Sequence, residues 1–433
     1  MLKKISGSAT GGDRNMVDVD VISTLPDELL YHILSFLPTK QALATGVLSK
    51  RWANLPRPLQ VLHLDEDGSN PTRCRSFISL VDTLMLSHHN QHISITSLHL
   101  KYNGSSHLLS RFKLDQWMAA AKQRHIQDLT LSLPSFHLPP CILTSQTLVL
   151  LDLTSLFIQP SSSVHLPSLK TLRLQQITFD SPHDPLRLLS LCPVLEDFHA
   201  AHFYFRQHDH ATYFTPLPNK NLIKANIFST THLPLPMSAF LNLEFLDITK
   251  GTFNGDAFPT FNNLIHLNIY ETSFRGWDLA VHVLQKCPKL QILNMRTGQR
   301  EEDWIFDWGY EGPNREDWEY PAYVPECVSS HLRIISLSDY GGWEDDLRFA
   351  AYILQKARVL QVMTIHCFDM CYCNSYHRRL VEILSSYPKI SHACELSVVT
   401  KGNKENEASP WWAPDRPFMF IAASLYFLYL VQR

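Results

Sequence analysis

The sequence lacks the features that would mark a nucleic-acid-binding, secreted or membrane-spanning protein. Its formal net charge is −3, so it has no basic excess with which to bind phosphates. The longest apolar stretch, 418–431, is shorter than the roughly 18–20 residues of a spanning helix. The nine cysteines are scattered and odd in number, and no apolar stretch typical of a signal peptide follows Met1. We therefore expect free thiols, a reducing compartment (cytoplasm, nucleus or both) and no nucleic-acid partner.

Motifs that indicate catalysis or a bound cofactor are also missing. The chain has no Gly-rich phosphate loop, no G-x-S-x-G turn and no H-E-x-x-H helix. The nearest approach to a metal site is His366-Cys367 with Cys371 and Cys373, which has soft ligands but no C-x-x-C pair. We expect free thiols there, and we predict a protein that is not an enzyme and needs no cofactor or metal.

The composition is that of a folded protein with a sizeable core. Hydrophobic residues make up 45% of the 433 residues and charged residues 18%. These values are typical of globular rather than disordered chains, and the length is sufficient for two or three domains.

The segment 22–38 has the signals of a short helix. Pro26 suits the first turn, where its missing N–H costs nothing, and Asp27 and Glu28 place negative charge at the positive end of the helix dipole. Pro38 ends the helix because it disfavours the α conformation of the residue before it. One apolar face is expected to carry Leu30, Ile33, Leu34 and Leu37.

Two further short helices are expected between Thr39 and Pro56. The second runs from about Thr39 to Val47, and Ser49 can cap a third that contains Arg51 and Trp52. Three helices in so short a segment cannot bury all of their apolar side chains internally. The surplus apolar surface is therefore expected to contact the rest of the chain or a partner.

The residues 25–30, 33–40 and 47–52 closely resemble the F-box of plant F-box proteins. One departure is Pro56, which follows Asn54-Leu55 where many family members carry a second Trp, and which we expect to alter the last helix without abolishing docking. The resemblance implies binding to the Skp-type adaptor of an SCF cullin–RING ubiquitin ligase. The adaptor-binding residues that it implies are Leu25, Pro26, Leu29, Leu30, Ile33, Leu34, Leu37, Pro38, Val47, Leu48 and Trp52.

A Leu-x-x-Leu-x-Leu pattern recurs through the middle of the chain. From Leu148 onward its spacings are 21, 26, 27, 21, 21 and 26 residues, which is the period of leucine-rich repeats. The pattern predicts a solenoid of short strands whose leucines point inward and whose polar residues share one face. Phe198, Ala200 and Ala225 replace leucines, so we expect an irregular solenoid. The copies start at Ile95, Ile126, Leu148, Leu169, Leu195, Leu222, Leu243, Leu264 and Leu290.

The longer repeats contain expected helices that end at a Cys-Pro pair. These are 184–191 before Cys192 and 277–286 before Cys287, and we expect both helices on the convex side of the solenoid. Because the two cysteines occupy equivalent places, we interpret them as small buried spacers.

An acidic segment rich in tryptophan interrupts the repeats at 297–324. Its residues Trp304, Trp308 and Trp318 are weak candidates for substrate binding, because exposed tryptophans often carry binding energy. The alternative is a variable loop whose aromatic side chains fold back on the solenoid.

The segment 325–399 carries a different order of expected elements. A strand at 332–337, a helix at 344–357, a strand at 360–365, a helix at about 379–387 and a strand near 394–398 resemble the FBD domain of plant F-box proteins. The whole arrangement resembles the plant F-box/FBD/LRR-repeat family. The apolar end of 400–433 is open to three interpretations, which are a weak membrane contact, a docked strand or, as we favour, a poorly ordered end.

These observations predict an α/β fold in which a three-helix F-box precedes an irregular leucine-rich-repeat solenoid capped by an α+β FBD module. We expect a substrate-recognition subunit of an SCF-type ligase that binds a Skp-type adaptor, through it the cullin–RING subunits, and an unidentified target protein. One alternative is a sensor of a hormone-like small molecule, for which Lys170, Arg173, His266 and Asn268 give little support; another is a repeat scaffold unconnected to a ligase. The predicted divisions are a leader (1–19), the F-box (20–62), the solenoid (63–324), the FBD (325–399) and a tail (400–433).

Overall fold

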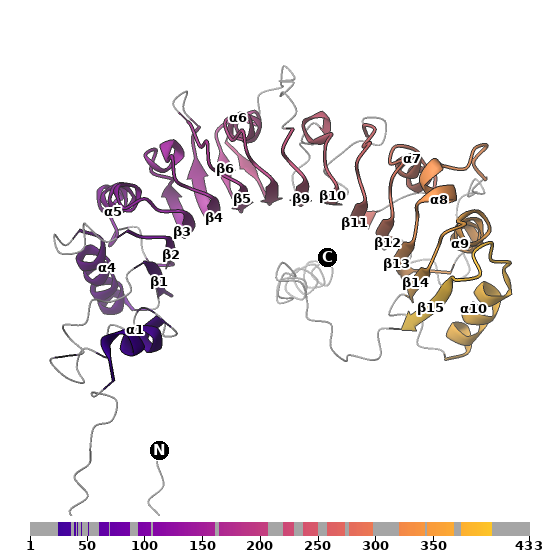
Figure 1. The fold of residues 1–433 in the computed structure, drawn as a ribbon, viewed down its shortest axis with the longest axis horizontal. Helices are drawn as coiled ribbons and strands as arrows, with labels where there is room; N and C mark the ends of the chain where they lie inside the picture. Colours follow the sequence, from indigo (N-terminus) through magenta and orange to yellow (C-terminus); the bar gives the residue numbers. More distant parts are fainter. Residues whose placement is uncertain are drawn as a thin grey trace, which may run out of the picture.

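The computed structural model is a mixed α/β structure in which the strands join a single curved sheet (Figure 1). It describes residues 25–35, 39, 41, 45, 51, 60–68, 70–86, 94–104, 107–160, 164–206, 220–228, 237–249, 258–272, 277–297, 320–342, 344–367 and 374–400. None of the described helices is long and apolar enough to span a bilayer.

The sheet is parallel and almost every strand lies beside the strand that follows it in the sequence. The order is β1-β2-β3-β4-β5-β7-β9-β10-β11-β12-β13-β14-β15, and off this path the short β6 pairs with β4 and the short β8 pairs with β6. Figure 1 shows the strands along the inner side of an arc, the helices from α4 to α10 on its outer side, and α1 at the end of the arc beside β1. The strands are β1 (Val61–Glu66), β2 (Ser97–Tyr102), β3 (Asp128–His137), β4 (Leu150–Ile158), β5 (Thr171–Gln175), β6 (Thr178–Phe179), β7 (Asp197–Ala201), β8 (Tyr204–Phe205), β9 (Lys224–Phe228), β10 (Phe245–Thr249), β11 (His266–Thr272), β12 (Ile292–Thr297), β13 (Ile334–Tyr340), β14 (Val362–Cys367) and β15 (Glu395–Thr400).

Helices or single helical turns fill several of the connections between strands. The helices α6 and α7 precede Cys192 and Cys287 and lie on the outer side of the arc, as predicted (Figure 1). The helical elements are α1 (Asp27–Ser35), α4 (Pro71–Leu86), α5 (Arg111–Gln123), η4 (Ile142–Thr144), α6 (Asp184–Ser190), η5 (Met237–Phe240), α7 (Asp278–Gln285), α8 (Glu326–Ser330), α9 (Glu344–Lys356) and α10 (Asn374–Ser386).

The repeated leucine pattern explains the sheet. Each of the nine predicted repeat positions, from Ile95 to Leu290, lies two residues before the start of a strand and is at most 2% exposed. Within a strand the next leucines, such as Leu172 and Leu174, are also buried, whereas the residues between them point to the opposite face. No single turn of the chain could bury these leucines alone, so the stacked strands provide one continuous core.

The sheet begins earlier than we predicted. Strand β1 starts at Val61, before the predicted start of the repeats at 63, and helices α4 and α5 were not anticipated. The sequence around β1 does contain a signal, because Leu59, Leu62 and Leu64 repeat the same Leu-x-x-Leu-x-Leu spacing.

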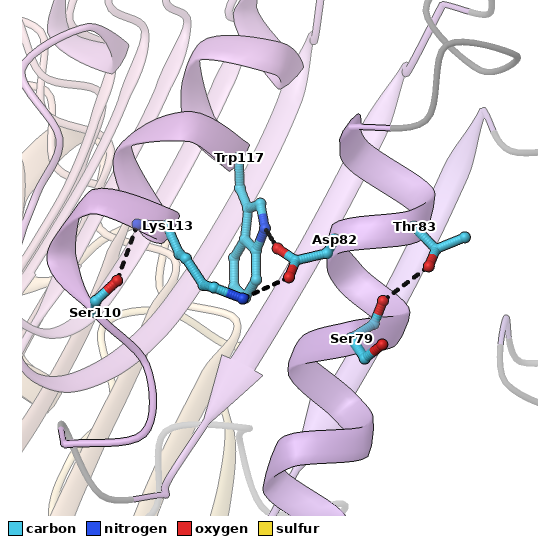
Figure 2. Close-up of polar contacts among 6 residues, drawn as sticks. All are labelled: Ser79, Asp82, Thr83, Ser110, Lys113 and Trp117. Atoms are coloured by element: carbon cyan, nitrogen blue, oxygen red, sulfur yellow. Dashed lines mark hydrogen bonds and ion pairs between the residues drawn. The ribbon is translucent and has the colours of Figure 1, made fainter.

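Helices α4 and α5 are joined by one acidic side chain (Figure 2). The Asp82 carboxylate accepts hydrogen bonds from Trp117 Nε1 at 2.8 Å and from Lys113 Nζ at 2.6 Å. Ser110 caps α5 by accepting a hydrogen bond from the backbone N–H of Lys113 at 3.3 Å. Trp117 is fully buried, so this contact fixes a large apolar group between the outer helices and the sheet.

The C-terminal strands continue the same sheet. Strand β13 pairs with β12 on one side and with β14 on the other, and β15 is the last strand. Across the outer layer the ring of Trp277 stacks on that of Phe349 at 4.0 Å, and Trp277 Nε1 donates to Asp346 Oδ1 at 3.1 Å. The segment predicted as a cap therefore contacts the rest of the structure through strand β13, which pairs with β12, and through helix α9, which contacts Trp277 beside α7.

The two Cys-Pro cysteines are buried as predicted. Cys192 Sγ donates to the Leu188 carbonyl oxygen at 3.3 Å, and burial raises the pKa of Cys192 to about 12. Burial also raises the pKa of Cys287. A thiol with so high a pKa is not ionised at neutral pH and is a poor nucleophile, which fits the spacer interpretation.

Several predictions fall on residues outside the described ranges. These are the leader, most of the second and third predicted helices, the tryptophans Trp304, Trp308 and Trp318, the thiols Cys371 and Cys373, and the tail beyond Thr400.

Candidate functional site

Helix α1 presents two apolar side chains outward. Leu29 and Ile33 are 49% and 41% exposed, whereas Leu30 and Leu34 are 0% and 2% exposed. The first turn is closed by the carbonyl oxygen of Pro26, which accepts from the N–H groups of Leu29 and Leu30. Leu29 and Ile33 are four residues apart and therefore neighbours on one side of the helix. We call this exposed pair the α1 face.

A hydrogen-bonded arginine holds the start of α1 in place. Arg51 Nη2 lies 2.6 Å from both Asp27 Oδ1 and the carbonyl oxygen of Leu25, to which it donates. This contact closes a loop of more than twenty residues and also places positive charge beside the acidic first turn. The pair is partly exposed, so its contribution to stability is small, on the order of 1 kcal/mol or less.

The same N-terminal segment contacts the first strand of the sheet. Thr39 is buried, and its Oγ1 accepts a hydrogen bond from the backbone N–H of His63 at 2.8 Å. Strand β1 pairs only with β2 among the described residues, and the His63 N–H lies on its other edge. Thr39 therefore satisfies a backbone donor that the sheet leaves unpaired.

Replacing Thr39 with valine tests this contact. The variant keeps the shape of the side chain and loses the acceptor, so we expect a loss of about 1 kcal/mol and about fivefold faster amide exchange at His63. Hydrogen exchange read by mass spectrometry on peptides covering β1 measures it. The control is Thr83→Val, which removes a hydroxyl that donates to the Ser79 carbonyl oxygen on α4 (Figure 2). Equal amide exchange rates in β1 of Thr39→Val and Thr83→Val would contradict the hydrogen bond between Thr39 and the His63 N–H.

The inner face of the sheet carries an unbroken row of polar side chains, one from each strand of the main path. We call it the inner row. Its members are direct neighbours in the strand register and lie opposite the buried leucines. They are His63, His99, Thr130, Asp152, Arg173, His199, Asn226, Asp247, Asn268, Asn294, Ser336, Thr364 and Ser397.

The middle of the inner row is a buried hydrogen-bond network centred on Asp247. Its carboxylate accepts from Asn268 Nδ2, and Asn268 Oδ1 accepts from Asn294 Nδ2 at 2.7 Å. In the amide orientation that satisfies its neighbours, Asn226 donates to Asp247 at 3.0 Å and accepts from His199 Nδ1 at 2.6 Å. Burial raises the pKa of Asp247 to about 6, although the Asn268 hydrogen bond and the charge of Lys224 oppose the shift.

Aromatic side chains flank this network on both sides. The Phe245 ring lies 4.9 Å from Lys224 Nζ and 4.6 Å from the ring of His266. On the other side, the rings of Phe228 and Tyr270 are 5.6 Å apart. Aromatic groups beside polar groups are typical of the centre of protein-binding surfaces.

Comparison with known proteins identifies one domain in the N-terminal part of the chain and one in the C-terminal part. The F-box domain family matches residues 22–62, and the FBD family matches residues 319–365. An F-box/FBD/LRR-repeat protein of Arabidopsis thaliana is 28% identical over 434 residues, covering 87% of this chain and 99% of the relative. An FBD-associated F-box protein of the same plant is 28% identical over 404 residues, covering 80% of this chain and 100% of the relative. The two domain matches and these relatives support the plant F-box/FBD/LRR-repeat family for this chain.

Helix α1 thus lies inside the F-box match, and its geometry divides the residues predicted to bind the adaptor. Leu29 and Ile33 are exposed, whereas Leu30 and Leu34 are part of the core and stabilise the module itself. Leu25 is half-buried and Pro26 is exposed. The remaining predicted residues, Leu37, Pro38, Val47, Leu48 and Trp52, lie outside the described ranges.

The residues named for a small-molecule sensor do not form a common anion site in the described part of the chain. Lys170 pairs with Glu196 at 2.9 Å, and Arg173 lies 3.9 Å from Asp152. His266 Nε2 and Asn268 Oδ1 are 2.9 Å apart within the buried network. Each of these groups therefore already contacts a neighbouring polar group within the chain, and no contact among them favours the sensor function.

Proposed function

We propose that this chain is the substrate-recognition subunit of an SCF-type cullin–RING ubiquitin ligase. F-box proteins generally act as substrate adaptors of such ligases. The observation that carries the proposal is the α1 face, because Leu29 and Ile33 are large apolar side chains left exposed inside the F-box match. Exposed apolar pairs in a small module are stabilised when a partner covers them. We propose that this partner is the Skp-type adaptor.

The rest of the chain would present the target. The period of the leucine pattern and the stacked parallel strands support an irregular leucine-rich-repeat solenoid, which the FBD closes at its C-terminal end. The inner row and its aromatic neighbours supply hydrogen-bonding and apolar groups on one concave surface. We propose this surface as the target-binding surface and the cytoplasm or the nucleus as the place where the complex forms.

In this proposal the chain contributes no reacting group. Other subunits supply the ubiquitin-charged enzyme, and the receptor raises the concentration of the target beside it. The rate then depends on simultaneous binding of adaptor and target, so weakening either contact lowers ubiquitination of the target without changing the chemistry.

Affinity capture from plant cells with the proteasome blocked tests the proposal. Wild type is expected to capture a Skp-type adaptor and a cullin, and Leu29→Ala/Ile33→Ala is expected to lose both while keeping its target. The matched control is Phe112→Ala, which removes an exposed apolar side chain from α5. Capture of adaptor and cullin by the double variant at the wild-type level would contradict the proposal. We avoid Leu30 and Leu34, because truncating buried leucines destabilises the module itself.

A further inference from the structure

Three potential metal ligands meet at the N-terminal end of the inner face. His63 and Asp65 lie on β1, and His99 lies opposite His63 on β2. The two imidazole rings are stacked, with centroids 4.1 Å apart and planes 4° from parallel. One oxygen of the Asp65 carboxylate is 3.1 Å from His99 Nε2, and the other is 3.5 Å from His63 Nε2. The Nε2 atoms of both rings therefore approach the same carboxylate.

The spacing of these atoms suits a small divalent ion. One ligand atom from each of the three residues lies within 4.8 Å of the others, and within the described ranges no other group of three residues does this. A tetrahedral Zn²⁺ site, with bonds of about 2.0–2.1 Å, places its ligand atoms roughly 3.3 Å apart. The two oxygen–nitrogen distances already have that length. The two distances reach different oxygens of the Asp65 carboxylate, and the two imidazole rings are nearly parallel, so the rings have to tilt toward each other before both Nε2 atoms point at one ion. His63 and Asp65 are exposed, which leaves room for this rotation.

The chemistry of the group also fits. Two imidazoles and one carboxylate form a donor set that Zn²⁺ and related transition metals accept. Parallel pairing fixes the register of β1 and β2, so the three side chains start from rigid backbone positions. Lys101 lies opposite Asp65 in the register, so its ammonium group is the cation that competes with a metal ion for the Asp65 carboxylate.

We propose that His63, Asp65 and His99 form a binding site for one divalent transition-metal ion of the Zn²⁺ class. Water fills the remaining coordination position on the inner face. The ion joins β1 to β2 at the end of the sheet where the His63 N–H contacts Thr39 of the F-box segment. Binding therefore stabilises the junction between F-box and sheet, and this inference does not depend on the ligase function.

Titration of the purified, untagged full-length chain with Co²⁺ and then Zn²⁺ tests the site. Co²⁺ serves as a spectroscopic probe for tetrahedral coordination, and calorimetry gives the affinity for Zn²⁺. Wild type is expected to bind one ion with the visible absorption of a tetrahedral site. His99→Ala and Asp65→Asn are each expected to weaken binding by more than about tenfold, because even the loss of an outer-sphere partner costs that much. The control is His165→Ala, an exposed histidine elsewhere in this histidine-rich chain.

A second measurement separates loss of the site from loss of the fold. The melting temperature of metal-free Asp65→Asn is expected to match that of metal-free wild type, because Asp65 lies outside the core. Added Zn²⁺ is expected to raise the melting temperature of wild type and of His165→Ala but not of Asp65→Asn. Equal Zn²⁺ affinity in wild type, His99→Ala and Asp65→Asn would overturn the proposal, as would wild type that binds no ion.

Discussion

Replacing Trp117 with alanine is expected to lower the free energy of unfolding by about 3–5 kcal/mol, the usual cost of removing a buried aromatic side chain. Trp117 is fully buried between α4, α5 and the sheet, and its Nε1 donates to the Asp82 carboxylate. The variant therefore creates a cavity and also removes one of the two hydrogen bonds that the Asp82 carboxylate of α4 accepts from α5 (Figure 2).

Urea denaturation followed by far-ultraviolet circular dichroism measures this effect. The matched control is Phe112→Ala on the same helix, because this aromatic side chain is 69% exposed and its loss leaves no cavity. We expect the control to change the free energy of unfolding by less than about 0.5 kcal/mol. Similar losses in the two variants would show that Trp117 does not occupy the core position assigned to it.

Asp247→Asn is expected to change how stability depends on pH. Burial raises the pKa of Asp247 from 3.8 to about 6, so the folded protein holds this proton more tightly than the unfolded chain does. The contribution of this group to stability is complete below pH 4 and is lost as the pH rises through 6. A shift of this size corresponds to roughly 3 kcal/mol. As the pH rises from 4 to 7, the free energy of unfolding of wild type is therefore expected to fall by roughly 3 kcal/mol relative to that of the variant.

Urea midpoints of wild type and Asp247→Asn measured across that pH range test the expectation. Asparagine keeps an oxygen for Asn268, and the amide of Asn226 can turn to accept from the new N–H group. Asp128→Asn removes an exposed carboxylate from β3 and is the control, with no comparable pH-dependent difference expected. If the difference between wild type and Asp247→Asn is constant from pH 4 to pH 7, the carboxylate is not held in the buried network described above.

The sheet could be predicted from the sequence because its cause is local and repeated. Leu172 and Leu174 alternate with polar residues inside one strand, and the same spacing recurs in each turn of the chain. Helix α9 could also be predicted from the sequence, because its three acidic residues mark the first turn and its buried residues follow the helical period. The repeat at β1 was missed although Leu62 and Leu64 follow the same pattern, because it lies at the edge of the F-box segment.

The sequence predicts that the polar residues of the strands share one face, but which of them are direct neighbours depends on the register between strands far apart in the sequence. Asp247 and Asn268 are 21 residues apart, and only the in-register pairing of β10 and β11 makes them neighbours. The same limit applies to His63 and His99, which meet across β1 and β2. The residue between the two leucines of each Leu-x-Leu unit is the sequence signal for the row, because these residues become neighbours once the strands are aligned in register.

The division of the F-box residues also required packing information. Leu29 and Ile33 are four residues apart, and so are Leu30 and Leu34, so the spacing alone allows either pair to face the core. The structure buries Leu30 and Leu34 and leaves the α1 face exposed. A variant of the buried pair would destabilise the helical segment itself, whereas a variant of the exposed pair tests the proposed adaptor interface.

The most direct test of the proposed adaptor contact is the dissociation constant of the purified full-length chain for a purified plant Skp-type adaptor, measured by calorimetry. We expect wild type and Phe112→Ala to bind with the same affinity. We expect Leu29→Ala/Ile33→Ala to fold normally and to bind about 30-fold more weakly, which corresponds to about 2 kcal/mol for the loss of central apolar anchors. Unchanged affinity in the double variant, or no binding by wild type, would contradict the assignment of the α1 face to the adaptor.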